Sequence, residues 1–273
     1  MIRLDGEPKG GVTLPPWHGK QDRTTQQQTA HSAFGTIKAV RGLLGGTRYG
    51  FQIDLPATRA AVGFDGFSRA QVIDVNRSLV MGADEFYTLE FLPDHGWKCG
   101  TGLFTGCELW ESWQHYAPPA LAIQAHDTYV GFVSKTGPPV TNYALDHKGK
   151  YVSAVGAPKS GVGVTRLPDC YMVPPSDYAQ GVVHQYIVRR RVTMTVGVTG
   201  VLEGWYRFKG AKTFKPAFSL TGYPTVQYDP HGGVGSCFDV VQAYRGPSTA
   251  PVTVKVGGYS RSDSFAEAAA FLP

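Results

Sequence analysis

Residues 48–56 read RYGFQIDLP, and this short stretch decides the fold class. Apolar and polar side chains alternate along it, and the apolar set is Tyr49, Phe51, Ile53 and Leu55. Alternation with a period of two is typical of a β-strand that has one buried face and one wet face. The same pattern returns in EFYTLEFLP (85–93) and in VTMTVGV (192–198). Several half-buried strands are therefore predicted.

The composition agrees with an all-β protein. The 273 residues include 34 glycines and 19 prolines, and 12% of them are aromatic, which favours many short strands joined by tight turns. The hydrophobic fraction of 42% is enough for a large core. We expect two antiparallel sheets packed face to face in a jelly roll, with a concave outer face where a long ligand could lie.

The chain divides into a short arm and one domain. Residues 1–35 show no clear period and are predicted to form an N-terminal arm or edge segment, whereas 36–273 are predicted to form a single domain. Residues 137–181 lack sustained alternation and suggest long loops over one end of the sandwich.

Only DSFAEAAAF (263–271) reads as a helix. Asp263 or Ser264 would cap its start, and Phe265 and Phe271 would pack back on the body.

The charge pattern argues against nucleic acid as a partner. The formal net charge is +5, but the basic residues are scattered and the longest run is Arg189, Arg190 and Arg191. In a strand Arg189 and Arg191 share one face, which we expect to be solvated. An acidic polysaccharide would suit the charge equally well. The N-terminus lacks the pattern of a signal peptide, and no run of 18 apolar residues occurs, so neither membrane insertion nor signal-directed export is expected.

Signatures of common enzymes are absent. The sequence lacks HExxH, GxSxG, a phosphate loop and GxGxxG, and its four cysteines lack CxxC spacing, so neither a cofactor nor a metal is expected. Cys99 and Cys107 could face each other across a hairpin, although buried thiols are the simpler interpretation. Glu108 and Glu111 are three residues apart, which is not the alternate spacing that puts two carboxylates on one strand face, so a glycoside hydrolase is not favoured.

The order of several segments resembles the heparin-lyase-like polysaccharide lyases. The resemblance covers about residues 45 to 271 and rests on the ordered set rather than on one motif. The segments are FSRAQ (67–71), DEFYTLEFLPDHGW (84–97), ELWESWQHYAPPALAI (108–123), HQYIVRRRVTMTVGVTGVLEGWYR (184–207) and QAYRGPSTAPVTVKVGGYSRSDSFAEAAAF (242–271). The resemblance implies a concanavalin A-like β-jelly roll and β-elimination next to a uronate.

The resemblance also implies roles for particular residues. The catalytic set would be Arg69, Gln114, His115 and Tyr244. Glutamine and arginine can neutralise a uronate carboxylate, and histidine or tyrosine can take or give the proton. The carbohydrate-binding set would be Trp113, Trp205 and Arg245. Taken alone, each of these residues is also compatible with a structural role, as a surface histidine, a core tryptophan or a pair that caps a strand.

The sequence departs from that family at three positions. Val240 and Gln242 stand where such lyases carry lysine and glycine, and Gln71 stands where an acidic residue is expected. A missing cation weakens the stabilisation of the transition state, so efficient catalysis is not expected.

The C-terminal segment contains YPTVQYDPHGG (223–233), followed by QAYRG (242–246) and GGYSRSDSFAEAAAF (257–271). It is similar to lyase-like jelly rolls in minor tail proteins of phages that infect actinobacteria. The resemblance implies a virion tail protein, assembled in the host cytoplasm, that contacts cell-surface polysaccharide. Its other expected partners are tail proteins and further copies of itself in a homo-oligomer. Two alternatives remain: an active polysaccharide lyase, and a purely structural tail subunit.

Overall fold

The structure is a computed structural model. It describes residues 2–4, 32–34, 36–57, 67–73, 77–99, 106–114, 121–136, 143–145, 170–193, 200–222, 225–226, 236–245, 248 and 250–272. The backbone alone is described at 2–4, 32–34, 67–73, 77–78, 113–114, 134–136, 143–145, 236 and 238.

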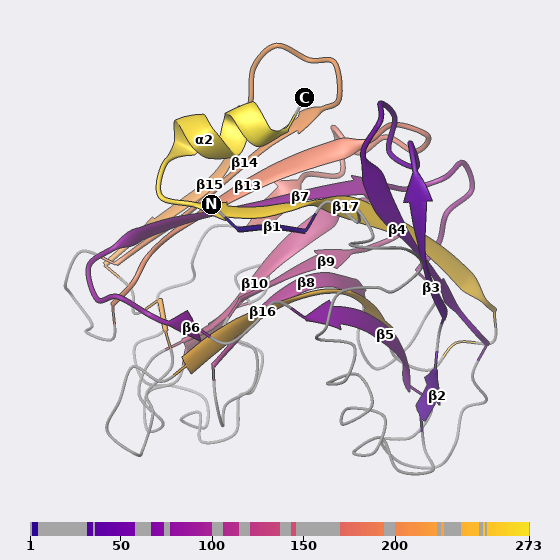
Figure 1. Ribbon diagram of the computed structural model, residues 1–273, viewed down its shortest axis with the longest axis horizontal. Coiled ribbons are helices and arrows are strands. Elements are labelled where there is room, and N and C mark those ends of the chain that lie inside the picture. The colour runs from indigo at the N-terminus through magenta and orange to yellow at the C-terminus, as the bar shows by residue number, and fades with distance from the viewer. Residues whose placement is uncertain are drawn as a thin grey trace.

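Two sheets form the two layers of a sandwich (Figure 1). The eight-stranded sheet runs, in spatial order, β15 (Lys215–Thr221), β14 (Val201–Phe208), β13 (His184–Arg191), β7 (Asp84–Leu92), β17 (Val252–Ser262), β4 (Tyr49–Leu55) and β3 (Thr36–Arg41), with β1 (Ile2–Leu4) paired to β17. The nine-stranded sheet runs β11 (Tyr143–Leu145), β10 (Val130–Thr136), β9 (Leu121–Ala125), β8 (Cys107–Gln114), β16 (Ser236–Arg245), β5 (Phe67–Ile73) and β2 (Ser32–Phe34), with β12 (Tyr171–Val173) paired to β10 and β6 (Arg77–Ser78) paired to β16. The predicted all-β jelly roll is confirmed.

The alternating stretches behave as expected where they are described. In β4 the side chains of Phe51, Ile53 and Leu55 are at most 1% exposed and belong to the core between the sheets. The stretch 85–93 is confirmed as β7. The third stretch differs, because β13 ends at Arg191 and residues 194–198 lie outside the described part. Within the predicted loops at 137–181, β11 and β12 add short strands to β10.

A single helix, α2 (Phe265–Phe271), is found in the described part of the chain. Its N-cap is Ser264, whose hydroxyl accepts a hydrogen bond from the backbone N–H of Glu267, as the sequence predicted. At its other end the guanidinium groups of Arg48 and Arg207 donate to the carbonyls of Phe271 and Leu272. These bonds satisfy carbonyls that the end of a helix otherwise leaves unpaired.

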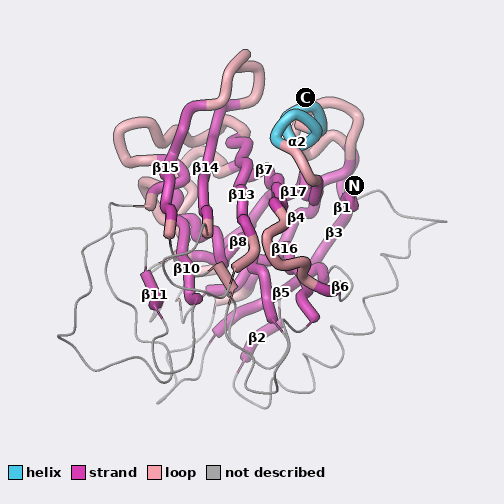
Figure 2. The backbone as a smooth tube through the Cα atoms, turned by 90° about the vertical axis from the view of Figure 1, so that its left-hand side faces the viewer, coloured by secondary structure: helices cyan, strands magenta, loops and turns pink. Residues whose placement is uncertain are grey.

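The helix lies on the outer face of the eight-stranded sheet (Figures 1 and 2). It buries Ala268 and Phe271 against Phe86 and Ile187 of that sheet. The outer face of the nine-stranded sheet is on the other side of the sandwich, away from α2.

A charged group lies in the interior. The Arg190 side chain has no exposed surface and pairs with Glu85 at 2.7 Å, and it also donates to the hydroxyl of Tyr87 in its own sheet. In the facing sheet it donates to the hydroxyl of Ser112 at 3.3 Å. Its neighbours Arg189 and Arg191 share the outer face, as alternation predicted, and both pair with Asp84 there. Arg190 thus joins the two sheets.

We predict that Arg190→Met destabilises the protein by about 3–5 kcal/mol, because it leaves the largely buried carboxylate of Glu85 without its cation. Arg191→Met is the matched control; its side chain is 33% exposed, so it should cost at most about 1 kcal/mol. Urea denaturation measures both free energies of unfolding. Equal losses in the two variants would contradict the linking role of Arg190.

A buried histidine lies toward the other end of β13. His184 is fully buried, and its Nε2 donates to the carbonyl of Ala179 at 2.6 Å, since a carbonyl can only accept. Its Nδ1 then accepts from the Tyr186 hydroxyl at 3.2 Å. Removal from water lowers the pKa of His184 from 6.5 to about 4. The side chain is therefore neutral at neutral pH.

This pKa predicts acid lability. Below pH 6.5 the unfolded chain takes up a proton that folded His184 resists until about pH 4, so stability should fall as the pH drops through this window. The loss should approach about 3 kcal/mol in urea denaturation followed from pH 7 to pH 4. His184→Gln should flatten this part of the profile. An unaltered slope in His184→Gln would refute the assignment.

Candidate functional site

The outer face of the nine-stranded sheet carries polar side chains. In β16, Val241 and Ala243 belong to the core, so alternation turns Val240, Gln242 and Tyr244 to the outer face. Gln242 is buried and Tyr244 is half-buried. This face is the candidate site.

A β-bulge in β8 brings two carboxylates to the same face. The pairing of β8 with β9 shifts between Glu108 and Trp110, and Leu109 is the extra residue. Leu109 and Trp110 both belong to the core, so Glu108 and Glu111 both take the outer face. The expectation that their spacing separates them was wrong, because the bulge adds one residue to the strand. Glu108 is 3% exposed and Glu111 is 1% exposed.

Cross-strand pairing arranges a polar row around Glu108. Along the row, Arg69 of β5 pairs with Tyr244 of β16, Tyr244 with Glu108 of β8, and Glu108 with Gln124 of β9. The amide of Gln124 donates to Oε1 of Glu108 at 3.0 Å. We call these four positions the polar row. Arginine, tyrosine, glutamate and glutamine thus occupy neighbouring positions across four strands.

Only part of the predicted catalytic set comes together. Arg69 and Tyr244 are cross-strand partners. Gln114 pairs with Cys237, seven residues from Tyr244 along β16, which corresponds to roughly 23 Å at the rise of a strand. Trp113 pairs with Phe238 at the same distant end. His115 lies outside the described residues.

The other two predicted carbohydrate-binding residues lie elsewhere. Trp205 is half-buried under α2, with its ring 5.0 Å from that of Phe265. It lies with the core cluster on the outer face of the eight-stranded sheet, opposite the polar row. Arg245 is 2% exposed, and its guanidinium donates to the carbonyls of Cys99, Pro56 and Ala250. These contacts tie loops together at the end of β16.

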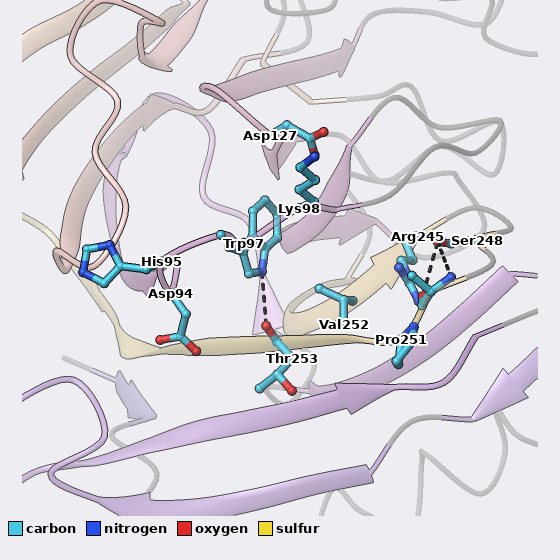
Figure 3. Close-up of a pocket in the computed structure, with 12 residues that line it drawn as sticks. Asp94, His95, Trp97, Lys98, Asp127, Arg245, Ser248, Pro251, Val252 and Thr253 are labelled. Atoms are coloured by element: carbon cyan, nitrogen blue, oxygen red, sulfur yellow. Dashed lines mark hydrogen bonds between the residues drawn. The ribbon is translucent and has the colours of Figure 1, made fainter.

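Arg245 also lines a cavity of about 600 Å³ at the end of the sandwich (Figure 3). The walls come from residues 94–98, from Asp127 and from the start of β17. Trp97 lies between the two sides of this cavity, and its indole N–H donates to the carbonyl of Thr253 at 3.1 Å.

Three charged groups that line the cavity, Asp94, Asp127 and Arg245, already have protein partners. Asp94 pairs with Lys255 at 2.7 Å, and Asp127 accepts from the backbone N–H of Cys99 at 2.9 Å. The Cys99 thiol also donates to Asp127, and burial together with this contact raises the pKa of the thiol. We therefore assign this cavity a structural role and place the functional site on the polar row.

All four cysteines are buried thiols, as expected. Among the described residues, no group of three or more histidine, cysteine or acidic side chains is placed to hold a metal ion. No helix in the described part of the chain has the length and hydropathy needed to cross a membrane.

The fold is shared with known polysaccharide lyases. The structure is similar to that of an endo-β-1,4-glucuronan lyase from the fungus Trichoderma reesei, with a TM-score of 0.61 and 12% identity over 86% of this chain and 89% of that chain. It is also similar to the marine PL-14 alginate lyase from Aplysia kurodai, with a TM-score of 0.45 and 8% identity over 84% and 87% of the two chains. Alginate lyase A1-II′ of polysaccharide lyase family 7 gives 0.41 and 11% over 79% and 80%. No protein-family model matches the chain, and no curated protein matches its sequence at a significant level.

The similarity to the glucuronan lyase establishes the class of fold. The chain is a β-jelly-roll sandwich of the kind found in polysaccharide lyases. At this level of identity the fold alone carries over, and activity must be argued from the residues of this chain.

Sequence reasoning missed Glu108, Glu111, Gln124 and Gln242 as site residues. The signal available for Gln124 was its place in the alternating segment 120–124, where it is the polar residue of an apolar strand. Glu108 and Glu111 gave no such signal, because the bulge brings them to one face at a spacing of three residues, whereas a regular strand requires a spacing of two.

Proposed function

We propose that this protein is a glycan-contacting jelly roll that binds cell-envelope polysaccharide along the outer face of its nine-stranded sheet. The single observation that carries the proposal is the polar row, which runs across four adjacent strands. Amide, carboxylate and phenol groups can accept from and donate to the hydroxyls of a sugar. A row of this kind suits a long ligand that lies across the strands.

We further propose that the protein is a virion component, a minor tail protein that meets the glycan on the host surface. The support is the resemblance of the C-terminal segment 223–271 to lyase-like domains in minor tail proteins of phages that infect actinobacteria. In this setting its partners are other tail proteins and further copies of the same chain. Binding to the envelope then precedes or accompanies attachment of the particle.

Efficient elimination at a uronate is not part of the proposal. Glu108 is the cross-strand neighbour of Tyr244, so a uronate held beside Tyr244 would lie near a carboxylate of the same sign. Arg69, the other cross-strand neighbour of Tyr244, is the cation of the polar row, and Val240 stands where active lyases add a lysine. Without that second cation the transition state is stabilised less, so we propose binding without efficient elimination.

The binding face can be tested with two matched glutamine variants. Gln124→Ala removes an amide of the polar row, whereas Gln52→Ala removes a half-buried amide on the outer face of the eight-stranded sheet, where it donates to Asp54. On an array of neutral, amino-sugar and uronate oligosaccharides and on cell-wall polysaccharide from actinobacteria, we expect Gln124→Ala to weaken binding about tenfold, because one hydrogen bond to the ligand is lost. Gln52→Ala should bind like the parent protein. Absence of binding by the parent would leave the purely structural subunit.

Active elimination is the second candidate, favoured by the pairing of Arg69 with Tyr244. It predicts a rise in ultraviolet absorbance from unsaturated uronate products when the protein is incubated with glucuronan or alginate, because elimination creates a conjugated double bond. We expect no such rise. A rise that disappears in Tyr244→Phe and in His115→Ala would establish the lyase and overturn the proposal of binding without efficient elimination.

A further inference from the structure

We propose that two copies of the chain associate through the exposed face of α2, with their two helices antiparallel. The helix lies on the outer face of the eight-stranded sheet, on the side of the sandwich opposite the polar row (Figure 1). This contact lies beyond the proposed function, because it uses the layer that does not carry the polar row and requires no glycan.

One end of this surface is acidic. Asp263 directly precedes the N-cap Ser264, and Glu267 lies in the first turn of α2. Both side chains are exposed, and among the described residues neither carboxylate has an ion pair with a lysine or an arginine. The helix dipole favours negative charge at this end. We call Asp263 and Glu267 the acidic end; its two charges face solvent.

The other end is basic. The guanidinium groups of Arg48 and Arg207 donate to the last carbonyls of the helix end, and the ammonium group of Lys209 donates to two carbonyls of the β3–β4 turn at 2.9 and 3.2 Å. Both arginines also lie over aromatic rings, Arg48 at 4.4 Å from that of Phe271 and Arg207 at 4.3 Å from that of Phe214. These contacts hold the three cations in place, but carbonyls and rings carry no net charge to cancel theirs.

A fourth cation lies on the β14–β15 hairpin, which projects from the same side of the molecule as α2 (Figure 2). The register pairs Tyr206 with Lys215, and its continuation sets Lys212 opposite Lys209. The side chain of Lys212 is exposed. In the described part of the chain, these four cations form one ion pair, between Lys209 and Glu90 at 3.7 Å, and Glu90 is 3% exposed. The basic end, with its excess of positive charge, consists of Arg48, Arg207, Lys209 and Lys212.

Between the two ends the surface is apolar. Ala266 and Ala270 of α2 are exposed. Beside the helix, Trp205, Phe214 and Phe265 are half-buried, and the rings of Trp205 and Phe214 lie 5.0 and 5.8 Å from that of Phe265. Protein interfaces are enriched in tryptophan, phenylalanine and arginine, with an apolar centre and a polar rim. The surface of α2 and its surroundings has both parts.

The arrangement of charge makes this surface complementary to itself. The seven residues of α2 separate the acidic end from the basic end by roughly 10 Å. A two-fold axis that crosses the helix at right angles exchanges its ends, so the acidic end of each copy meets the basic end of the other. A parallel arrangement would set like charges together. The charges therefore fix the orientation, and the aromatic centre supplies most of the affinity.

Sedimentation velocity of the purified full chain measures the association. We expect a dimer whose fraction rises with protein concentration. Glu267→Lys and Lys212→Glu should each weaken the dimer at least about tenfold, because each change sets two pairs of like charges in contact. Lys98→Glu is the matched control, since it makes the same change of charge at an exposed position beside the cavity at the end of the sandwich. It should associate like the parent.

An equal mixture of the Glu267→Lys and Lys212→Glu proteins separates a contact between copies from an effect within one chain. In a mixed dimer each contact again joins a cation to a carboxylate, so the mixture should dimerise within a few fold of the parent. Ala270→Arg adds a long charged side chain at the apolar centre and is the second disrupting variant. It should also weaken the dimer at least about tenfold. Circular dichroism checks the folding of every variant.

The proposal is overturned if the parent stays monomeric at every concentration, if the charge variants dimerise like the parent, or if the mixture is no more dimeric than its components. Every variant should keep the parent's binding to glycans, because the changes lie in the layer opposite the polar row. Absence of glycan binding by the parent would remove the proposed function and leave the dimer unaffected, so the two failures are distinguishable.

Discussion

The buried ion pair between Arg190 and Glu85 sets the constraint on which the rest of the structure depends. A guanidinium without exposed surface is tolerated only where its charge and its N–H groups are matched. Arg190 meets this condition by bonding to Glu85 and Tyr87 in one sheet and to Ser112 in the other. The two layers are thereby fixed at one register, because a shift of either sheet would break these bonds together.

The hydrogen bond between Arg190 and Ser112 also affects the candidate site, because Ser112 belongs to β8. Ser112, which Arg190 holds from the inside, is the residue next to Glu111, and neighbouring residues of a strand point to opposite faces. The interior bond therefore fixes the direction in which Glu111 leaves the sheet. At the bulge, Leu109 and Trp110 pack in the core, and these apolar contacts fix the direction in which Glu108 leaves the sheet. The polar row and the carboxylate pair are thus held in place from the inside.

The fold was predictable where one local pattern decides the outcome. In β4 alternation alone identified Phe51, Ile53 and Leu55 as core. The helix start was narrowed to Asp263 or Ser264, and the structure shows that Ser264 is the cap. Alternation put Arg190 on the face opposite Arg189 and Arg191, but it gave no sign of what would pair with a buried guanidinium. The acceptors of Arg190 come from strands far away in the chain, so they had no local signal.

The site was less predictable for the same reason. A bulge depends on how two strands pair, so Glu108 and Glu111 appeared to point apart until the register of β8 and β9 was known. The pairing of Arg69 with Tyr244 joins residues far apart in the sequence, and only the resemblance to lyases had suggested that both belong to one site. The resemblance also grouped Trp205 with them, although β14 places it in the other sheet. An ordered set of motifs indicates a fold better than it assigns its residues to a surface.

β1 pairs with β17, and α2 packs on the same sheet. Both ends of the described chain belong to the eight-stranded layer, so a neighbour attached through either end would approach from that side. The opposite, nine-stranded layer would then face away from that neighbour. Under the proposed function, an assembly built in this way would leave the polar row facing the medium without any rearrangement of the domain.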